Sequence, residues 1–261
     1  MGQQIEEVIR LTEISLFKHI RGRLIVSCQS RPGEPLYGPV YMAEMAKAAQ
    51  MGGACAIRAN GAGDVAAIRD AVRLPIIGIE KRRVPGFEVY ITPSAEDAVG
   101  VARAGSAMIA IDGTPGSRPP DSSGRTWTVP ELVRFIHDEL GLPVMADIST
   151  AEEGLAAEDV GFDCVAPTLS GYTHYSPALE GPDFDLIEEL SARLTVPVIA
   201  EGRIASPEEA RKALDLGAWA VVVGKAITMP HTIVERFVKA VAGRLDKDFI
   251  ASVCLPLLFS V

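Results

Sequence analysis

The sequence predicts an α/β fold, a single (β/α)8 TIM barrel of the phosphate-binding type. Three observations carry this prediction. About eight short apolar runs alternate with helical patterns, the runs are almost purely apolar, and polar residues follow several of them. Such runs are typical of parallel strands that are buried on both faces. A flavodoxin-like or Rossmann sheet is the alternative, but no G-x-G-x-x-G motif follows the first run.

The clearest strand–helix unit lies near the end of the chain. An apolar run at 197–200 is followed by Ser206 and Pro207, which are favoured at the N-cap and in the first turn of a helix. A second apolar run follows at 219–223. These two runs are the predicted seventh and eighth strands of the barrel.

Glycines follow both of these strands, at Gly202 and Gly224, and a basic residue comes next in each case, Arg203 and Lys225. The loops after the seventh and eighth strands of a barrel often hold a phosphate. Glycine allows an anion to approach the backbone N–H groups closely. We expect these four residues to form a phosphate site, although a glycine that ends a strand is also common in an ordinary tight turn.

Composition and charge narrow the class of partner. The chain has 261 residues with 48% hydrophobic content, which is enough for one barrel core. Its net charge of -9 argues against nucleic acid, whose binding proteins carry basic faces. An anionic small-molecule substrate would require positive charge to be concentrated in the site.

The two ends of the chain differ from the predicted barrel. We expect an N-terminal helical extension at 1–21, with an amphipathic helix over the bottom of the barrel, a catalytic barrel domain at 22–245, and an apolar tail at 246–261. The apolar stretch is shorter than the ~20 residues that span a bilayer. No signal peptide is visible, and the four cysteines form no C-x-x-C pair. These features predict a cytoplasmic protein without membrane contact.

Polar residues follow several of the predicted strands, which indicates that the active site lies at the mouth of the barrel, the end at which the strands finish. These residues are Gln29, Arg58, Lys81, Asp112, Asp147 and Glu201. Lys81, Asp147 and Glu201 end the third, fifth and seventh strands, and alternate strands contribute to one layer. The lysine is therefore expected between two carboxylates. Such a set suits proton transfer next to a carbonyl, or a Schiff base.

Each of these residues also has an ordinary structural explanation. Lys81 begins the basic run 81–83, which is typical of a solvated surface, Asp147 is placed to cap a helix, and Arg58 is placed to form a structural ion pair. The histidines have no metal-ligand spacing, and His137 is expected to be exposed in the middle of a helix. The sequence therefore predicts no metal site.

Nine motifs together resemble the N-acetylmannosamine-6-phosphate 2-epimerase family. They are LIVSCQ (24–29), AIRAN (56–60), PIIG (75–78), VYITP (89–93), MADIS (145–149), TLSGYT (168–173), GPDF (181–184), IAEGR (199–203) and VVVG (221–224). The resemblance implies a (β/α)8 barrel enzyme of sialic-acid salvage. Such an enzyme interconverts N-acetylmannosamine 6-phosphate and N-acetylglucosamine 6-phosphate without metal or cofactor, usually as a homodimer.

The resemblance also implies roles for individual residues. Lys81 matches the family's catalytic lysine, and Asp147 and Glu201 match its carboxylate partners, with Asp147 holding the lysine. Gln29 and Arg58 match its substrate-contacting glutamine and arginine. Tyr172 is a further expected substrate contact, because its loop at 171–175 could close over the substrate, although an ordinary surface loop is equally consistent with the sequence. Gly202 and Gly224 match the glycines of the phosphate site.

One departure concerns the phosphate. The family commonly has an arginine where this chain has Met229, whereas Lys225 is an additional basic residue. Lys225 is expected to serve the phosphate as a point charge instead. Two other functions remain open: a Schiff-base aldolase or lyase that uses Lys81, and a non-catalytic sugar-phosphate sensor.

Overall fold

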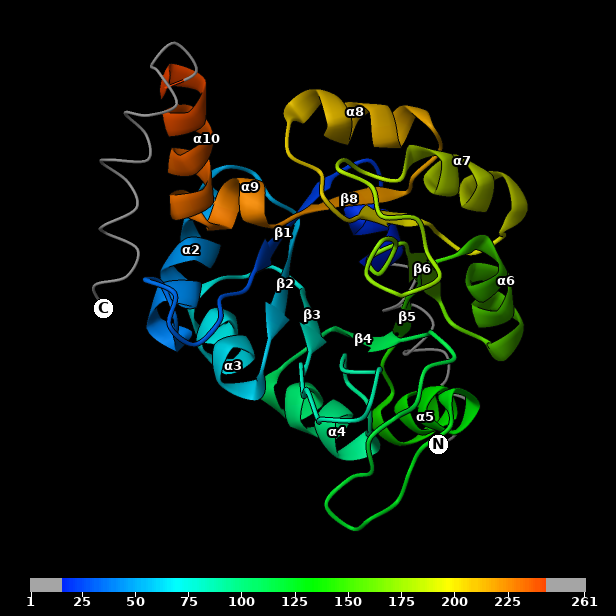
Figure 1. Cartoon of the computed structure of the whole chain (residues 1–261). Coiled ribbons are helices and arrows are strands. Elements are labelled where there is room, and N and C mark those ends of the chain that lie inside the picture. Colours follow the sequence, from blue (N-terminus) through cyan, green and yellow to red (C-terminus); the bar gives the residue numbers. More distant parts are fainter. Residues whose placement is uncertain (1–15, 243–261) are drawn as a thin grey trace.

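The computed structural model describes residues 16–242, and its centre is a ring of eight parallel strands (Figure 1). The strands follow the order β6–β5–β4–β3–β2–β1–β8–β7, and a parallel bridge between Val165 and Val198 joins the two ends. Their bounds are β1 Leu24–Cys28, β2 Ala56–Asn60, β3 Ile76–Ile79, β4 Met108–Asp112, β5 Val144–Asp147, β6 Cys164–Ala166, β7 Ile199–Glu201 and β8 Ala220–Val223. The predicted barrel is confirmed, and the doubly wound sheet was the wrong alternative.

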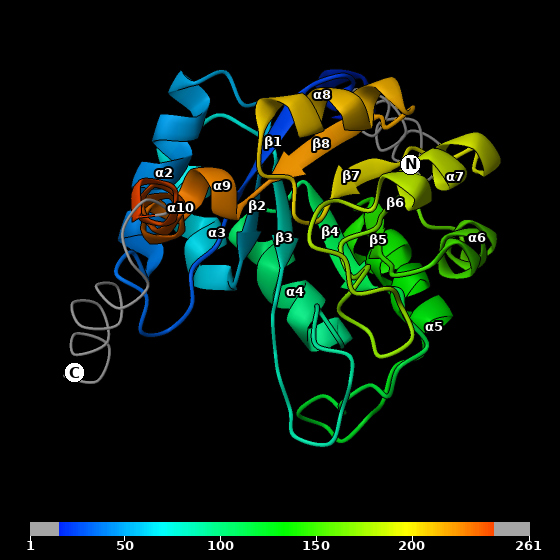
Figure 2. The same cartoon turned by 45° about the horizontal axis from the view of Figure 1, so that its top comes forward.

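Helices connect the strands and surround the ring, as Figures 1 and 2 show. They are α2 Pro39–Met51, α3 Ala62–Ala71, α4 Ala95–Ala104, α5 Val129–Phe135, the π-helical segment η1 Ile136–Leu140, α6 Ala151–Val160, α7 Phe184–Arg193, α8 Pro207–Asp215, α9 Lys225–Thr228 and α10 Pro230–Ala242. Within residues 16–242, none of these helices combines the length and apolar character needed to cross a membrane.

Predicted N-caps start several of these helices. The Ser206 hydroxyl accepts the N–H of Glu209 at 3.2 Å, and Pro207 is the first residue of α8. Thr150 caps α6 and forms a capping box with Glu153. Each of these caps lies a few residues after the end of a strand, so the connecting loop is short.

Side chains along each strand alternate between two cores. In β4, Met108 and Ala110 belong to the cluster inside the ring, whereas Ile109 and Ile111 pack with residues of the surrounding helices. Because this alternation continues to the end of a strand, residues two positions after an inner residue also point inward.

Residues 16–20 are helical and close the lower end of the barrel. Leu16, Phe17 and Ile20 pack with the inner cluster, and Trp219 Nε1 donates to the Phe17 carbonyl at 2.8 Å. The rest of the predicted N-terminal extension, residues 1–15, and the predicted tail at 246–261 lie outside the described residues.

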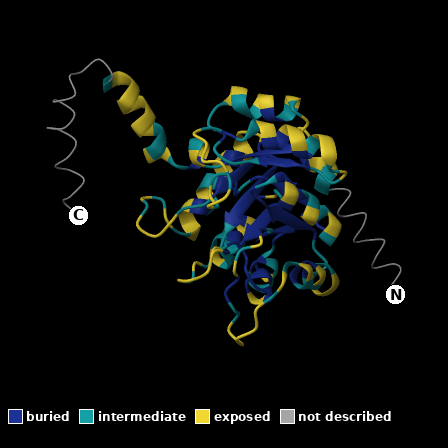
Figure 3. Cartoon of the chain, turned by 45° about the vertical axis from the view of Figure 1, so that its right-hand side comes forward, coloured by how far each residue is buried: buried dark blue, intermediate teal, exposed yellow. Residues whose placement is uncertain are grey.

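Helix α10 stands off the barrel next to α9 (Figure 3). None of its residues is buried. Its exposed apolar residues are Val234, Phe237, Val238 and Val241, which follow the i, i+3, i+4, i+7 spacing of one helix face.

The environment of His137 differs from the one expected. His137 lies in η1, its side chain is 30% exposed, and its Nε2 lies 2.9 Å from Asp163 Oδ2. Asp163 also accepts the N–H of Val144 at 2.6 Å, so the pair ties η1 to the start of β5. The sequence pattern missed this contact because its partners are 26 residues apart.

Candidate active site

The strand-end residues predicted from the sequence lie at one mouth of the barrel. Arg58, Asp147 and Glu201 come two positions after the inner residues Ala56, Met145 and Ile199, so they point inward. The same alternation turns these further residues inward: Gln29, Lys81 and Asp112.

Arg58 lies between two carboxylates. Its Nη1 donates to Asp147 Oδ1 at 3.0 Å, and further hydrogen bonds join its guanidinium to Asp147 Oδ2 and Glu201 Oε2. The side chains of Arg58 and Asp147 are 1% and 0% exposed, and that of Glu201 is 12% exposed. Thr168 Oγ1 also donates to Asp147 Oδ1, at 2.6 Å. Side chains from three strands and one loop thus form one buried network.

These contacts shift the protonation equilibria of the network. Burial alone would lower the pKa of Arg58, but the Asp147 and Glu201 charges raise it, so Arg58 stays cationic. Burial raises the pKa of Glu201, and the Asp147 charge adds to that rise against the opposing Arg58 charge. Glu201 therefore holds a proton at higher pH than an ordinary glutamate does.

Lys81 does not lie between the carboxylates, and the expectation from strand numbering was wrong on this point. Its Nζ donates to Gln29 Oε1 at 2.6 Å. Arg58 occupies the place between Asp147 and Glu201 because a guanidinium presents a fork of N–H groups that serves both carboxylates. The structural ion pair considered for Arg58 is therefore present.

The pKa of Lys81 is lowered from its ordinary value of 10.5 to about 8, first by burial and then by the positive charge of Arg58. Glu201 and Asp147 oppose this shift. Lys81 is an exposed residue, so solvent still reaches its side chain. A substrate that covered the mouth would exclude this solvent and lower the pKa further.

The backbone of Lys81 is fixed from two sides. Its N–H donates to Asn60 Oδ1 at 2.8 Å, and an antiparallel bridge pairs Lys81 with Ile91. Neither contact was predicted from the sequence. Asn60 comes two residues after Arg58, and this spacing on one strand was the available signal for an inward position. No local pattern indicates the bridge, which joins two parts of an irregular loop.

Gly202 and Gly224 follow the neighbouring strands β7 and β8, as expected. Gly202 has φ 122°, a conformation that favours glycine, and a Cβ added at Gly224 would lie 3.3 Å from Ser27 Cβ. The short helix α9 begins directly after Gly224. The N–H groups of Ile227 and Thr228 donate to the Gly224 carbonyl, which leaves those of Lys225 and Ala226 for an anion at this end of the mouth.

The guanidinium of Arg203 is engaged by the loop between β6 and α7. Its Nε donates to the Gly181 carbonyl at 2.7 Å and its Nη1 to the Ser170 carbonyl at 2.5 Å. Its Cζ lies 5.6 Å from the ring centroid of Tyr172, which is 58% exposed. Arg203 therefore fastens this loop at the end of β7, and its role toward a phosphate stays a prediction.

Lys225 is exposed at the first position of α9, whereas Met229 follows the last residue of this helix. Lys225 therefore adjoins the free N–H groups of α9, and Met229 lies one turn away along the chain. A role for Lys225 at a phosphate likewise stays a prediction.

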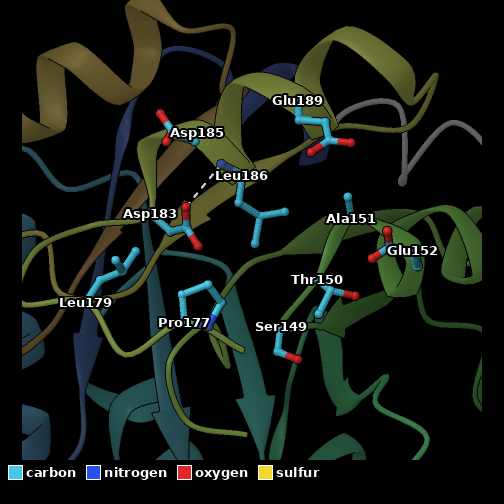
Figure 4. Close-up of a pocket in the computed structure, with 10 residues that line it drawn as sticks. All are labelled: Ser149, Thr150, Ala151, Glu152, Pro177, Leu179, Asp183, Asp185, Leu186 and Glu189. Carbon is cyan, nitrogen blue, oxygen red and sulfur yellow. Dashed lines mark hydrogen bonds between the residues drawn. The ribbon is translucent and has the colours of Figure 1, made fainter. Parts of the chain in front are cut away.

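A separate cavity of about 320 Å³ lies outside the network (Figure 4). It is lined by Ser149, Thr150, Ala151, Glu152, Pro177, Leu179, Asp183, Asp185, Leu186 and Glu189. Four of these residues are acidic, and none is a predicted site residue. Because carboxylates repel a phosphate, the barrel mouth is the better candidate site.

Among residues 16–242, no group of three or more His, Cys, Asp or Glu side chains is arranged to hold a metal ion. The expectation that the reaction needs neither metal nor cofactor stays a prediction.

Comparison with known proteins decides the family. A family model described as "Putative N-acetylmannosamine-6-phosphate epimerase" matches residues 42–243. The chain belongs to this epimerase family. The resemblance inferred from the sequence motifs is therefore confirmed.

Curated relatives in the N-acetylmannosamine-6-phosphate epimerase family are about half identical to this chain. The protein named "Putative N-acetylmannosamine-6-phosphate 2-epimerase" from Caldanaerobacter subterraneus subsp. tengcongensis is 51% identical over 232 residues, which is 89% of this chain and 96% of that protein. A protein of the same name from Clostridium perfringens strain ATCC 13124 is 50% identical over 218 residues, which is 84% of this chain and 96% of that protein.

Solved structures agree with this family and with the fold. The N-acetylmannosamine-6-phosphate 2-epimerase of Clostridium perfringens superposes with a TM-score of 0.81 at 48% identity, covering 86% of this chain and 95% of that one. Thiamine phosphate pyrophosphorylase of Pyrococcus furiosus, with a TM-score of 0.52 at 16% identity, shares the fold alone.

Proposed function

We propose that this protein is an N-acylglucosamine-6-phosphate 2-epimerase that converts N-acetylmannosamine 6-phosphate to N-acetylglucosamine 6-phosphate in amino-sugar and sialic-acid salvage. One observation carries the proposal. Lys81, with its pKa lowered to about 8, lies in an open barrel mouth next to the buried Arg58–Asp147–Glu201 network. The names of the relatives, at about 50% identity, support the choice of substrate.

The chemistry follows from the position of the C2 proton. In the open-chain sugar, C2 adjoins the C1 aldehyde, which acidifies its proton. Neutral Lys81 removes this proton and becomes an ammonium, and the electron pair of the C–H bond moves to the aldehyde oxygen to give an enolate. Return of a proton to the opposite face of C2 inverts this centre and restores the aldehyde.

Glu201 and Arg58 assist this proton transfer. The raised pKa of Glu201 allows it to hold a proton that it shares with the enolate oxygen. The positive charge of Arg58 keeps the pKa of Lys81 low and stabilises negative charge that develops in the mouth. Asp147 holds Arg58 by two hydrogen bonds, and this role replaces the expected direct contact with Lys81.

The phosphate and the sugar occupy different parts of the mouth. Gly202, Gly224 and the first N–H groups of α9 receive the phosphate, and the Lys225 charge adds to the attraction. Arg203 contributes charge and braces the loop through its backbone contacts. Gln29 and Tyr172 contact the sugar oxygens from the two sides of the mouth.

A Schiff-base aldolase or lyase would also need a lysine with a lowered pKa. Borohydride reduction in the presence of the sugar phosphate separates the two reactions. The epimerase account expects no covalent adduct on Lys81, whereas a Schiff-base enzyme would be labelled and inactivated.

A non-catalytic sensor is the second alternative, and the methionine at position 229 is its best support. Such a protein would bind the sugar phosphate without converting it. The network of Arg58, Asp147 and Glu201 beside Lys81 favours catalysis, because binding alone does not require a lysine with a lowered pKa.

We also infer that the protein works as a homodimer in the cytoplasm. The apolar face of α10 favours association with a second copy, since its Phe237 and Val241 are 69% and 74% exposed. The cysteines of the described chain, Cys28, Cys55 and Cys164, are buried and unpaired, which is typical of a reducing compartment.

The direct test is conversion by the purified protein. Proton NMR of N-acetylmannosamine 6-phosphate should show the gluco epimer accumulating to equilibrium without added metal, and unphosphorylated N-acetylmannosamine should react far more slowly. Binding of the phosphorylated sugar without any conversion would favour the sensor instead.

A further inference from the structure

Strand β1 lies between the two ends of the mouth. In the barrel order β3–β2–β1–β8, its neighbours are β2, on the side of Lys81, and β8, which leads into Gly224. Ser27 and Gln29 follow the inner residue Ile25 at two-residue steps, so both point inward. A connection between the lysine and the predicted phosphate loop along this side of the ring therefore passes through the end of β1.

On the lysine side, Gln29 is held in one orientation. Its Nε2 donates to Ser27 Oγ at 2.8 Å, and its Oε1 accepts from Lys81 Nζ at 2.6 Å. An amide has donors at one end and an acceptor at the other. The Lys81 ammonium has donors only and therefore selects the amide oxygen, and the Ser27 hydroxyl, at 7% exposure for the residue, holds the other end of the amide by accepting from it.

On the phosphate side, two contacts join the loop 224–228 to Ser27. Thr228 is 3% exposed, and its hydroxyl shares its proton between the Ser27 carbonyl at 3.0 Å and the Gly224 carbonyl at 3.2 Å. Gly224 packs so closely that an added Cβ would lie 3.3 Å from Ser27 Cβ. Both contacts depend on where α9 sits.

We propose that Ser27 and Thr228 are positioning residues that connect the phosphate loop to Lys81 through Gln29. The proposal rests on the proposed function, since it concerns the same site. An anion bound at Gly224 and the first turn of α9 holds this helix, and Thr228 transmits its position to Ser27. Gln29 then accepts one N–H of Lys81.

This connection has a chemical purpose. A neutral amine that donates one N–H to Gln29 can turn its lone pair in only two directions, and we infer that one of them faces the proton of C2. Binding energy from the phosphate, which does not react, is thereby used to orient the reacting groups. Such orientation affects kcat more than KM, because it counts in the transition state rather than in substrate binding.

The first test is kinetic and uses matched variants. Thr228→Val keeps the shape of the side chain but removes the hydroxyl, and Thr228→Ser keeps the hydroxyl. For N-acetylmannosamine 6-phosphate, Thr228→Val should lower kcat by about tenfold or more with less than about a threefold change in KM, and Thr228→Ser should stay within about threefold of wild type. Thr195→Val is the control, since exposed Thr195 contacts Glu158 instead.

A wild-type kcat in Thr228→Val would overturn the proposal, as would a loss that Thr228→Ser does not restore. The second test measures Lys81 itself and needs no turnover. The rate of its reductive methylation is followed against pH by peptide mass spectrometry, in wild type, Thr228→Val, Thr228→Ser and Ser27→Ala.

The hydrogen bond to Gln29 Oε1 stabilises the ammonium form of Lys81. Loss of this hydrogen bond in Thr228→Val and Ser27→Ala should therefore lower the pH midpoint of Lys81 methylation by about half a pH unit or more. Thr228→Ser should keep the wild-type midpoint. Identical midpoints in all four proteins would refute the connection. If the midpoints of Thr228→Val and Ser27→Ala are lowered but the wild-type protein converts no sugar phosphate, the proposed function is refuted and the connection stands.

Discussion

Arg58 and Asp147 form a two-point ion pair across the barrel mouth, with both side chains essentially buried. The pair joins β2 to β5, two strands that do not neighbour each other in the ring. Glu201 shares the same guanidinium from β7. One cation thus holds two carboxylates in place and lowers the pKa of Lys81 at the same time.

Removal of this cation should be severely destabilising. Arg58→Met leaves the Asp147 and Glu201 carboxylates without their cationic partner, so the free energy of unfolding should fall by about 3–5 kcal/mol. Arg58→Lys keeps the charge but lacks the planar fork that contacts Asp147 at two points, so an intermediate loss is expected. Urea titration followed by circular dichroism measures the difference. A stability within about 1 kcal/mol of wild type in Arg58→Met would mean that the pair is not a structural element.

The pH dependence of the reaction should report Lys81. Its lowered pKa of about 8 means that the neutral, basic form increases with rising pH up to this value. Accordingly, kcat/KM should rise by about tenfold per pH unit below the midpoint and level off above it. Lys81→Arg should be inactive throughout this range, because a guanidinium does not lose its proton and cannot act as the base. A rising limb centred above pH 10 would show that Lys81 has an ordinary pKa.

The charge on Lys225 should contribute to phosphate affinity. Lys225→Ala is expected to raise KM for the phosphorylated sugar by about tenfold with little change in kcat, because the charge attracts the phosphate equally in ground and transition states. Met229→Arg should lower KM. Lys47→Ala, at an exposed position on α2, is the control and should change neither parameter. An unchanged KM in Lys225→Ala would leave the phosphate to the glycines and N–H groups alone.

The apolar face of α10 should determine the oligomeric state. Phe237→Glu places a charge in the middle of this face, so a dimer that uses it should dissociate to monomers in sedimentation velocity. Lys239→Glu changes the charge by two units rather than one, on the opposite face of the helix, and should still leave the dimer intact. Dimers that survive Phe237→Glu would show that association uses another surface.

Much of the fold followed from local patterns. The N-cap at Ser206, the start of α8 at Pro207 and the glycines after β7 and β8 depend on neighbouring residues, and all were predictable. Burial on both faces made the strands read as continuous apolar runs.

The geometry of the site was less accessible from the sequence. Strand numbering placed Lys81 in a layer with Asp147 and Glu201, but it does not say which cation fills the space between the carboxylates. A long guanidinium on β2 competes for that space, and its fork of donors favours it. The contacts Lys81–Asn60 and Ser27–Thr228 join residues 21 and 201 positions apart, which no local pattern encodes.

The most direct test of the account follows the C2 proton. N-acetylmannosamine 6-phosphate is incubated with the protein in D₂O and observed by proton NMR, with Lys81→Met as the control. The account predicts conversion to the gluco epimer with deuterium at C2, and neither conversion nor exchange with Lys81→Met. Conversion that keeps the original proton at C2, or full activity of Lys81→Met, would contradict deprotonation of C2 by Lys81.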